Sequence, residues 1–333
     1  MTKIGVIGAG SWGSALAVSF ATNNQVLLYV RDSKQYQVMV QSNSNPNYLP
    51  SDVSWGDNLS CINDFGELES AQVLILAMPI NAMRSVLQQI KSHFVTIPHI
   101  IWVCKGFESS SGLLPHQIIN QELPGFDNYS ALLGPSFAAE VARLQPTAIC
   151  LVGNSNVTYL EKLRELINPE RNFRIYVNDD MVGSEVGAAV KNVLAIMVGV
   201  SDGLSLGYNA RSALITRSLN ELSSLVRALG GKTHTIYGLT GIGDLILTCT
   251  GELSRNRKIG LELAKGKKLD QIVSELGHVA EGVKTTVVVR NLGQQYGLDL
   301  PIINAVYAIL YESIDPQLVL IQLMERSFKV EFE

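Results

Sequence analysis

The sequence lacks the cysteine and histidine patterns that hold disulfides or metal ions. Its 4 cysteines and 5 histidines are scattered over 333 residues, and no two cysteines form a CxxC pair. Disulfide frameworks need pairs of cysteines, and structural zinc sites need clusters of cysteine and histidine ligands, at spacings that bring these side chains together. We therefore expect reduced thiols in a cytoplasmic protein, with no disulfide and no bound metal.

The sequence also lacks an excess of basic charge and a long uninterrupted apolar run. Its formal net charge is −4, which offers no overall positive field for nucleic acid. The most apolar segment, Val186 to Val200, contains Lys191 and Asn192 and is too short to span a bilayer, so it predicts a core helix. The chain opens on an apolar run without the charged and apolar regions of a signal peptide. A small molecule is the expected partner.

A chain of 333 residues exceeds what one compact core usually holds, so we expect two domains. Near Asp180 the strand-like runs stop and only helical periodicity follows. The sequence predicts an α/β domain over residues 1–180 and an all-helical domain over residues 181–333. The helices expected in the second domain are Met181–Leu206, Ala210–Ala228, Thr240–Leu247, Arg255–Lys265, Leu269–Glu275, Gly282–Tyr296 and Ile302–Leu310.

The stretch from Thr2 to Asp32 has the pattern strand, glycine turn, helix, strand. Its glycines follow the spacing GxGxxG, at Gly8, Gly10 and Gly13. In this pattern the first glycine allows a tight turn, the second lets the backbone approach a pyrophosphate, and the third lets the helix pack closely. Free N–H groups in the first turn of the helix would bind the phosphates. The stretch predicts a dinucleotide site, although a glycine turn in another kind of α/β protein is the alternative.

Further strand-like runs follow, and runs that are apolar throughout are typical of parallel strands covered on both faces. The expected strands are Ile4–Ile7, Val26–Val30, Val73–Ala77, Ile100–Cys104, Ser130–Leu133, Pro146–Val152 and Phe173–Val177. Ligands of open α/β sheets bind beyond the carboxyl ends of their strands. The residues expected at that rim of a Rossmann-type, mostly parallel sheet are Gly10, Arg31, Pro79, Lys105 and Ser136.

Arg31 bears on the choice of cofactor. It comes 18 residues after Gly13, where an acidic residue often receives the ribose hydroxyls of NAD. An arginine there suits a 2′-phosphate or stacking on adenine, whereas Asp32 beside it could still serve NAD. The sequence therefore predicts NADPH, with NADH possible. The alternative is a solvated arginine at the end of a strand.

Two lysines stand in apolar surroundings. Lys105 ends an apolar strand, and Lys191 lies within an apolar helix, where an ammonium group needs partners or a cleft. A lysine held in this way suits a general acid–base. The alternative for Lys191 is a side chain that extends to the surface.

Two polar segments of the helical half could bind or orient groups. A glycine-rich turn, Gly241 to Gly243, precedes Asp244, and Thr248 follows one helical turn later. Asp244 could orient a lysine or could simply cap a helix. The run Ser254 to Lys258, SRNRK, places a hydroxyl, an amide and guanidinium groups at a helix start, which suits an oxyanion such as phosphate. A solvated helix face is the alternative.

These segments together resemble the NAD(P)-dependent glycerol-3-phosphate dehydrogenase family in its bacterial form, over about residues 3 to 325. The resemblance rests on the order and spacing of GAGSWG (8–13), VCKGFE (103–108), LLGPSFAAE (132–140), VKN (190–192), GIGDL (241–245), SRNRK (254–258) and VAEGVKT (279–285). One departure follows Tyr48-Leu49-Pro50, where the family often has a glycine and a second Leu-Pro and this sequence reads SDVSW.

The resemblance implies that dihydroxyacetone phosphate is reversibly reduced to sn-glycerol 3-phosphate for phospholipid synthesis, by a homodimer. By resemblance, Lys191 is the proton donor and acceptor, Lys105 contacts substrate near the nicotinamide, and Asp244 keeps Lys191 aimed. The implied substrate-binding residues are Lys105, Gly134, Ser136, Lys191, Asn192, Asp244, Thr248, Ser254, Arg255 and Asn256. The implied cofactor-binding residues are Gly8, Gly10, Ser11, Trp12, Gly13, Arg31, Lys105, Ala138, Arg255, Val279 and Glu281.

Three alternative functions stay open. Another two-domain dehydrogenase could act on a 3-hydroxy acid or a sugar acid. A nucleotide-sugar oxidase would need a nucleophilic cysteine, and Cys249 is the only one near the expected site. A catalytically inactive NADPH-binding regulator is the third, against which Lys105, Lys191 and Asp244 argue.

Overall fold

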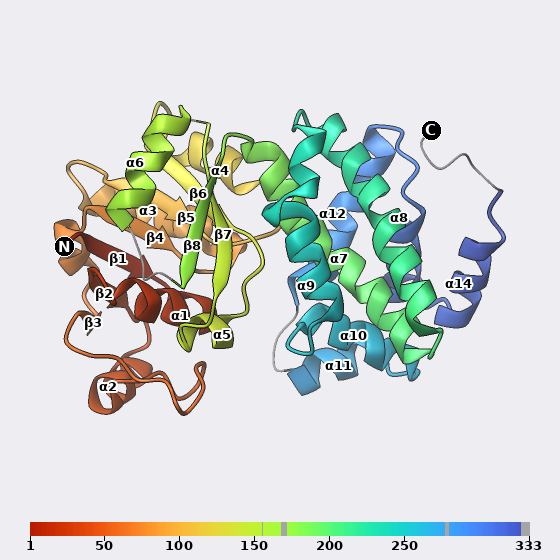
Figure 1. Cartoon of the computed structure of the whole chain (residues 1–333), viewed down its shortest axis with the longest axis horizontal. Coiled ribbons are helices and arrows are strands. Elements are labelled where there is room, and N and C mark those ends of the chain that lie inside the picture. Colours follow the sequence, from red (N-terminus) through yellow and green to blue (C-terminus); the bar gives the residue numbers. More distant parts are fainter. Residues whose placement is uncertain (155, 168–171, 277–279, 328–333) are drawn as a thin grey trace. The chain divides into compact units, whose positions relative to one another are not determined.

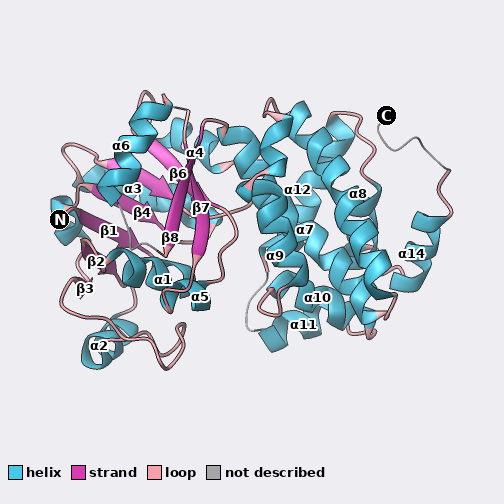
Figure 2. Ribbon diagram, viewed as in Figure 1, coloured by secondary structure: helices cyan, strands magenta, loops and turns pink. Residues whose placement is uncertain are grey.

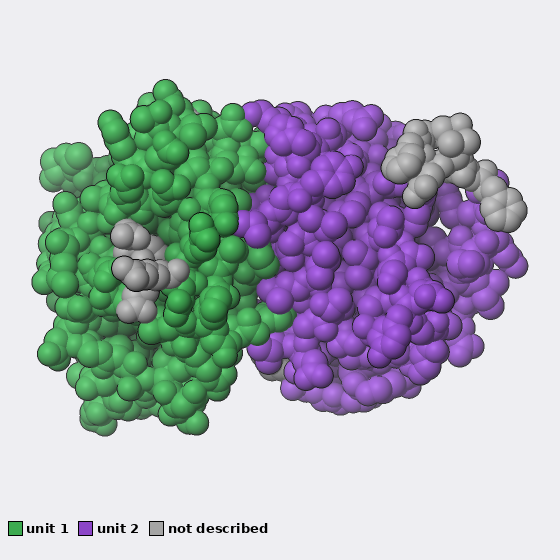
Figure 3. Space-filling model, viewed as in Figure 1, with its two compact units in different colours: residues 1–185 green, residues 186–333 purple. Residues whose placement is uncertain are grey.

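The chain divides into two compact units, residues 1–185 and residues 186–333 (Figure 3). The computed structural model describes residues 1–154, 156–167, 172–276 and 280–327. The boundary predicted after residue 180 falls at the start of helix α7 (Met181–Gly203), whose first residues belong to the first unit and whose remainder belongs to the second. The boundary between functional domains stays a prediction.

The first unit is built on one eight-stranded sheet, which Figure 2 shows in magenta. The strand order is β3-β2-β1-β4-β5-β6-β7-β8, and every neighbouring pair is parallel except β6 and β7. The strands are β1 (Lys3–Ile7), β2 (Gln25–Tyr29), β3 (Leu59–Ile62), β4 (Val73–Leu76), β5 (His99–Trp102), β6 (Tyr129–Leu133), β7 (Thr147–Val152) and β8 (Phe173–Asn178). The predicted mostly parallel sheet is confirmed.

The chain reverses its direction of travel across the sheet at β1. From β1 it proceeds outward through β2 to β3, and then returns to add β4, β5 and β6 on the other side of β1. The carboxyl ends of these six parallel strands lie along one edge, and the crevice at such a switch point is where ligands bind. The sheet therefore places the residues that follow β1, β2, β4, β5 and β6 at one edge, as the sequence predicted.

The sequence analysis did not predict strand β3. It has four residues, LSCI, and pairs only with β2 at the edge of the sheet. A run this short, with an exposed serine in it, carries too little periodicity to identify it as a strand.

The helices of the first unit are α1 (Ser11–Phe20), α2 (Ser33–Ser42), α3 (Met83–His93), α4 (Pro115–Glu122), α5 (Ala138–Ala142) and α6 (Val157–Ile167), as labelled in Figure 1. Helices α1, α2, α5 and α6 share one apolar core with the strands of this unit. The core includes Leu16 and Phe20 of α1, and the Phe20 ring lies 6.1 Å from that of Phe173 in β8. The buried, mainly apolar face of α1 thus holds the glycine turn that precedes it against the sheet.

The described residues of the second unit form helices joined by turns and loops, with no strand among them. Its helices after α7 are α8 (Gly207–Ala228), α9 (Asp244–Thr250), α10 (Arg255–Ala264), α11 (Leu269–Leu276), α12 (Glu281–Gln295), α13 (Pro301–Tyr311) and α14 (Pro316–Met324). A π-helical turn, Leu239–Gly243, leads into α9. The predicted all-helical C-terminal region is confirmed, and α14 is a helix that the sequence analysis did not predict.

Helix α7 is the core helix of the second unit. Among the described residues it is the one helix long and apolar enough to cross a membrane, but 94% of its most apolar window is buried inside the protein. It extends beyond the apolar run Val186 to Val200, which the sequence analysis took as too short to span a bilayer. Length therefore does not exclude a membrane span, but the burial of the helix argues against one. A Cβ on Gly260 of α10 would lie 2.0 Å from the Ile196 carbonyl oxygen, so the two helices touch backbone to backbone.

His99, at the start of β5, gives the first unit a pH-dependent stability. Its ring nitrogens lie 2.7 Å from Asn128 Oδ1 and 2.8 Å from Ser130 Oγ, and burial lowers its pKa from 6.5 to about 4 despite the Asn128 hydrogen bond. A neutral buried histidine must take up a proton on unfolding in acid. The stabilisation is therefore present above pH 6.5 and is lost as the pH falls towards 4.

We predict that His99→Gln flattens the acid dependence of stability. As the pH falls from 6.5 to about 4, the unfolding free energy of the wild type should decrease by up to roughly 3 kcal/mol more than that of the variant. Urea unfolding at a series of pH values measures this difference. The exposed His234 provides the control, because His234→Gln should leave the wild-type dependence unchanged. Parallel curves for wild type and His99→Gln would contradict the prediction.

Candidate active site

The glycine turn between β1 and α1 has the backbone geometry of a phosphate-binding turn. Gly8 has a φ of +118°, which favours glycine. A Cβ on Gly13 would lie 1.9 Å from the Gly8 carbonyl oxygen, whereas a Cβ on Gly10 would meet nothing within 4 Å. No side chain caps α1, so its first N–H groups are left for an incoming anion. The turn therefore fits the pyrophosphate of a dinucleotide.

Two side chains that the sequence analysis missed anchor this turn. Gln35 Nε2 and Asn45 Nδ2 donate to the Ala9 carbonyl oxygen at 2.8 and 3.0 Å, and Asn45 Nδ2 also donates to Ser14 Oγ at 2.8 Å. Asn45 is buried in the loop after α2. Nothing in the sequence links it to a turn 36 residues earlier, because only the folded loop brings them together.

The residues after β2 differ in how they are held. Asp32 caps α2, and its carboxylate accepts a hydrogen bond from the Gln35 N–H at 2.7 Å. Arg31 is exposed. Ser11, also exposed, begins α1, while the partly buried Trp12 and Ala138 pack against the apolar core of the first unit.

Three predicted substrate residues meet at the ends of β5 and β6. Lys105 Nζ donates to the Gly134 carbonyl oxygen at 2.9 Å, and Ser136 Oγ donates to the same oxygen at 3.1 Å. Gly134 has a φ of +145°, and a Cβ there would lie 3.2 Å from Ile149 Cα. Two neighbouring strand ends thus place an ammonium group and a hydroxyl on one carbonyl oxygen.

In the second unit, Lys191 of α7 forms a buried ion pair with Asp244 at the start of α9. Lys191 Nζ donates to Asp244 Oδ1, and the two residues are 7% and 1% exposed. Lys191 therefore does not extend to the surface. Asp244 is the first residue of α9, and no side chain caps the N-terminus of that helix. The Asp244 carboxylate therefore binds the lysine and does not cap the helix. The interpretation of Asp244 as the partner of a lysine is confirmed.

Gly187 lets the two elements of this pair come close, because a Cβ on it would lie 2.6 Å from the Thr240 carbonyl oxygen. The π-helical turn before α9 therefore packs tightly on the face of α7 that carries Lys191. A Cβ on Gly241 would lie 2.2 Å from the Ile236 carbonyl oxygen, so this glycine lets the π-helical turn pack on the short helix Thr233–Tyr237 that precedes it. Thr248 Oγ1 donates to the Asp244 carbonyl oxygen at 2.6 Å, within α9.

A chain of amides connects three helices beside the ion pair. Asn256 Nδ2 of α10 donates to Asn192 Oδ1 of α7 at 2.9 Å, and the Gly282 N–H of α12 donates to Asn256 Oδ1 at 3.2 Å. Both asparagines are buried. Glu281, partly buried, begins α12, and Val279 lies outside the described residues.

The SRNRK run is divided between structural and exposed roles. Ser254 is the N-cap of α10, and its Oγ accepts from the Arg257 N–H at 3.2 Å, which leaves its own O–H as a donor. Arg257 is tied to Asp202 of α7, with Nε and Nη2 at 2.8 and 2.7 Å from Oδ2. Arg255 is exposed. The run is thus neither wholly solvated nor wholly available for a ligand.

Cys249 cannot serve as the nucleophile of an oxidase. It is fully buried in α9, and burial raises its pKa to about 12. The thiol stays protonated at neutral pH, whereas the thiolate is the nucleophilic form. In the part of the chain that the structure describes, no group of three or more His, Cys, Asp and Glu side chains could hold a metal ion.

These features define the class of nicotinamide-dependent oxidoreductases with a Rossmann-type N-terminal sheet and a helical second unit. Two family models cover most of the sequence. The NAD-dependent glycerol-3-phosphate dehydrogenase N-terminus matches residues 3–158, and the C-terminus of the same family matches residues 180–321. The chain belongs to the NAD-dependent glycerol-3-phosphate dehydrogenase family.

Relatives and solved structures agree with this assignment. A protein of Janthinobacterium sp. (strain Marseille) named glycerol-3-phosphate dehydrogenase [NAD(P)+] is 46% identical over 333 residues, which cover 99% of both chains. One of Thiobacillus denitrificans with the same name is 43% identical over 331 residues, 99% of this chain and 100% of the relative. The crystal structure of glycerol-3-phosphate dehydrogenase from Coxiella burnetii matches with a TM-score of 0.90 at 38% identity, over 98% of this chain and 99% of that one. The chain is therefore an enzyme that uses a nicotinamide cofactor.

We predict that alanine at Gly13 lowers stability, whereas alanine at Gly10 does not. Gly13→Ala forces a methyl group against the Gly8 carbonyl oxygen, so it should cost about 1–3 kcal/mol or more. Gly10→Ala meets no atom and serves as the matched control. Thermal unfolding of both variants without cofactor measures the difference, and equal melting temperatures would show that the close approach at Gly13 is not limiting.

Proposed function

We propose that the enzyme reduces dihydroxyacetone phosphate with NADPH to sn-glycerol 3-phosphate, reversibly, and so supplies the backbone of phospholipids. The observation that carries the proposal is the buried Lys191–Asp244 ion pair, because it holds an ammonium group in an apolar helix at a fixed place. Relatives named glycerol-3-phosphate dehydrogenase [NAD(P)+] support the substrate. We propose that the enzyme acts as a cytoplasmic homodimer.

In this proposal the first unit holds the cofactor. N–H groups of the turn from Gly8 to Gly13 and of the first turn of α1 bind the pyrophosphate, and Gly10 keeps the approach open. The bound cofactor supplies the hydride for the carbonyl carbon. Further cofactor contacts are assigned to Ser11, Trp12, Arg31, Lys105, Ala138, Arg255, Val279 and Glu281.

The proton comes from Lys191. As the carbonyl carbon gains a hydride, the carbonyl oxygen becomes an alkoxide, which takes a proton from Lys191 Nζ. Asp244 keeps the ammonium group aimed through the buried ion pair, and Lys105 stabilises the developing charge as a second cation. In the reverse direction neutral Lys191 accepts the proton from the alcohol. No step requires a metal ion.

The phosphate of the substrate is held away from the reacting carbon. We assign it to the start of α10, where exposed Arg255 and the free O–H of Ser254 can both donate. Binding there fixes the position of the ketone, and such remote binding energy contributes to catalysis. The remaining substrate contacts are assigned to Gly134, Ser136, Asn192, Thr248 and Asn256.

Arg31 is proposed to favour NADPH over NADH. The Asp32 carboxylate, which would otherwise receive ribose hydroxyls, already caps α2. Arg31 is exposed and can pair with a 2′-phosphate.

The loss of NADPH absorbance on adding dihydroxyacetone phosphate tests the whole proposal. A regulator without catalytic activity would bind NADPH without oxidising it, and a hydroxy-acid dehydrogenase would not turn over this substrate.

We predict that Lys191→Met lowers the turnover number by about 10²–10⁴-fold, because it removes the proposed proton donor. NADPH binding, measured by quenching of protein fluorescence, should persist. Lys265→Met makes the same change at an exposed lysine of the second unit and is the control. Turnover of Lys191→Met within a few-fold of the control would show that another group is the acid.

We predict that Arg31→Ala raises the KM for NADPH by about 10-fold or more, since a charge-assisted contact is worth roughly 1.5–3 kcal/mol. The KM for NADH should change little. Lys34→Ala removes a neighbouring exposed cation and provides the control. Steady-state rates with each cofactor give the comparison. A wild-type enzyme that strongly prefers NADH would remove the proposed role of Arg31.

A further inference from the structure

The segment that follows β5, residues 103–114, is fixed at two points on either side of Lys105. At one end the Val103 N–H donates to the Leu76 carbonyl oxygen at 3.0 Å, which continues the ladder with β4. At the other end the segment closes on Glu108: its N–H donates to the Leu113 carbonyl oxygen, and its carbonyl oxygen accepts from the Gly112 N–H. The position of Glu108 therefore limits where Lys105 can lie.

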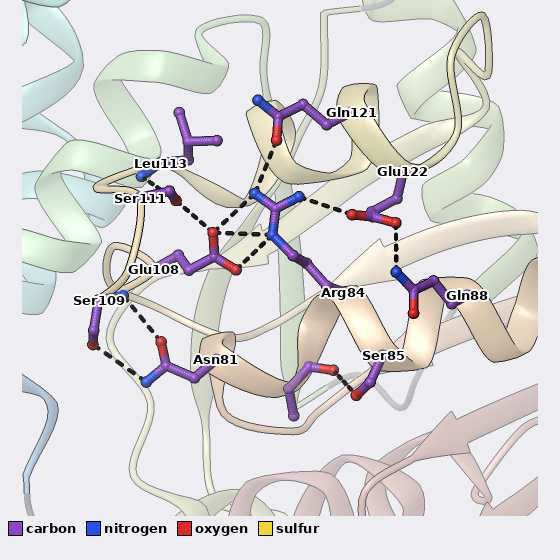
Figure 4. Close-up of polar contacts among 11 residues, drawn as sticks. Asn81, Arg84, Ser85, Gln88, Glu108, Ser109, Ser111, Leu113, Gln121 and Glu122 are labelled. Carbon is purple, nitrogen blue, oxygen red and sulfur yellow. Dashed lines mark hydrogen bonds and ion pairs between the residues drawn. The ribbon is translucent and has the colours of Figure 1, made fainter.

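The Glu108 carboxylate is held by Arg84 of α3 (Figure 4). Arg84 Nε lies 2.8 and 3.1 Å from the two carboxylate oxygens, and Nη2 lies 2.9 Å from Oε2. Ser111 Oγ also donates to Oε2. The side chain of Glu108 is 5% exposed, and the Arg84 guanidinium holds the pKa of this carboxyl below its usual value. The pair is bidentate and charged, with a buried carboxylate and a partly exposed guanidinium group.

Arg84 is itself fixed by helix α4. Its Nη1 donates to Glu122 Oε1 at 2.8 Å and its Nη2 donates to Gln121 Oε1 at 2.9 Å, while Gln88 Nε2 donates to the second oxygen of Glu122. Figure 4 shows the guanidinium group between Gln121 and Glu122 of α4 and Glu108 of the 103–114 segment. The segment is thus tied to the junction of two helices rather than left as a surface loop.

A second contact ties the same segment to the residues that follow β4. The Ser109 N–H donates to Asn81 Oδ1 at 3.0 Å, and Asn81 Nδ2 lies 3.3 Å from Ser109 Oγ. The tip of the segment is therefore held from two directions, by Asn81 and by Arg84. Gly106, with a φ of +123°, makes the turn between Lys105 and these contacts.

Burying the Glu108 carboxylate is an expensive way to stabilise a fold, because apolar side chains often replace a buried ion pair of the same volume as well or better. The pair does, however, fix a position closely, since the fork of the guanidinium matches the carboxylate in direction as well as charge. We propose that Glu108 and Arg84 are positioning residues that aim the Lys105 ammonium group at the substrate. This inference rests on the proposed function, in which Lys105 stabilises the developing alkoxide.

The inference predicts a loss of activity that depends on Lys105. A displacement of about 1 Å in a reacting group can cost roughly 100-fold in rate. Glu108→Gln keeps the shape of the side chain but removes the charge that pairs with Arg84. It should lower kcat/KM for dihydroxyacetone phosphate by about 10-fold or more, mainly through kcat, while the dissociation constant for NADPH stays within about two-fold.

A double-mutant cycle tests whether Glu108 acts through Lys105. The rates of the wild type, Glu108→Gln, Lys105→Met and the double variant are compared. In the Lys105→Met background, Glu108→Gln should change kcat/KM by less than about two-fold. Asp52→Asn breaks a bidentate pair with Arg143, elsewhere in the first unit, and is the matched control, with wild-type rates expected.

Each outcome of the cycle decides the question. Equal losses from Glu108→Gln with and without Lys105 would overturn the inference and assign Glu108 a merely structural role, as would a loss confined to cofactor binding. If Glu108→Gln fails to fold, Arg84→Lys replaces it, since it keeps the charge without the fork, and the same dependence on Lys105 is required. A wild type inactive on dihydroxyacetone phosphate would instead refute the proposed function. A Lys105→Met variant with wild-type kcat/KM would show that Lys105 has no role in catalysis, which overturns the inference but not the proposed function.

Discussion

The buried ion pair between Lys191 and Asp244 constrains the whole helical unit. A lysine in the middle of an apolar core helix is tolerated only with a partner, because an unpaired ammonium group there would carry a desolvation cost of several kcal/mol. The partner can reach it only if the turn before α9 lies against α7. That approach in turn depends on glycine at position 187, where a Cβ would meet the Thr240 carbonyl oxygen. Packing, charge and backbone geometry are therefore coupled at one point.

The first unit meets a different constraint, which is the shared edge of a parallel sheet. Parallel strands bring their carboxyl ends together whatever the sequence of the loops, so the glycine turn, Arg31 and Lys105 come to one edge by topology. Topology sets this neighbourhood only coarsely. Side-chain contacts then refine it: Asn45 and Gln35 hold the Ala9 carbonyl oxygen, and Arg84 holds the segment that carries Lys105. Chemistry placed on loops is thus supported by polar contacts from neighbouring helices and loops.

Pattern alone predicted strongly apolar elements and failed on those whose apolar run is interrupted or falls on both faces. The parallel strands β4 and β5 have four residues each, all of them buried, and the core helix α7 is long and apolar. Strand β3 also has four residues, but an exposed serine interrupts its apolar run. Helix α14 was not predicted because its apolar residues fall on both faces: Val319 and Leu320 are buried, whereas Leu318 and Ile321 are exposed. A helix without a clear apolar stripe gives no signal at a period of 3.6 residues.

The sequence by itself determined the class of fold, the dinucleotide turn and the family, because these depend on glycine spacing and apolar periodicity, which are local. It also marked Lys191 and Asp244 as candidates. Only the tertiary structure decided between the alternatives for them, since 53 residues separate the two and their pairing depends on how α9 packs on α7. The same holds for Glu108 and Arg84, and for Asp202 and Arg257. Ion pairs between distant residues leave no periodic trace in a single sequence, whereas a turn or an amphipathic helix does.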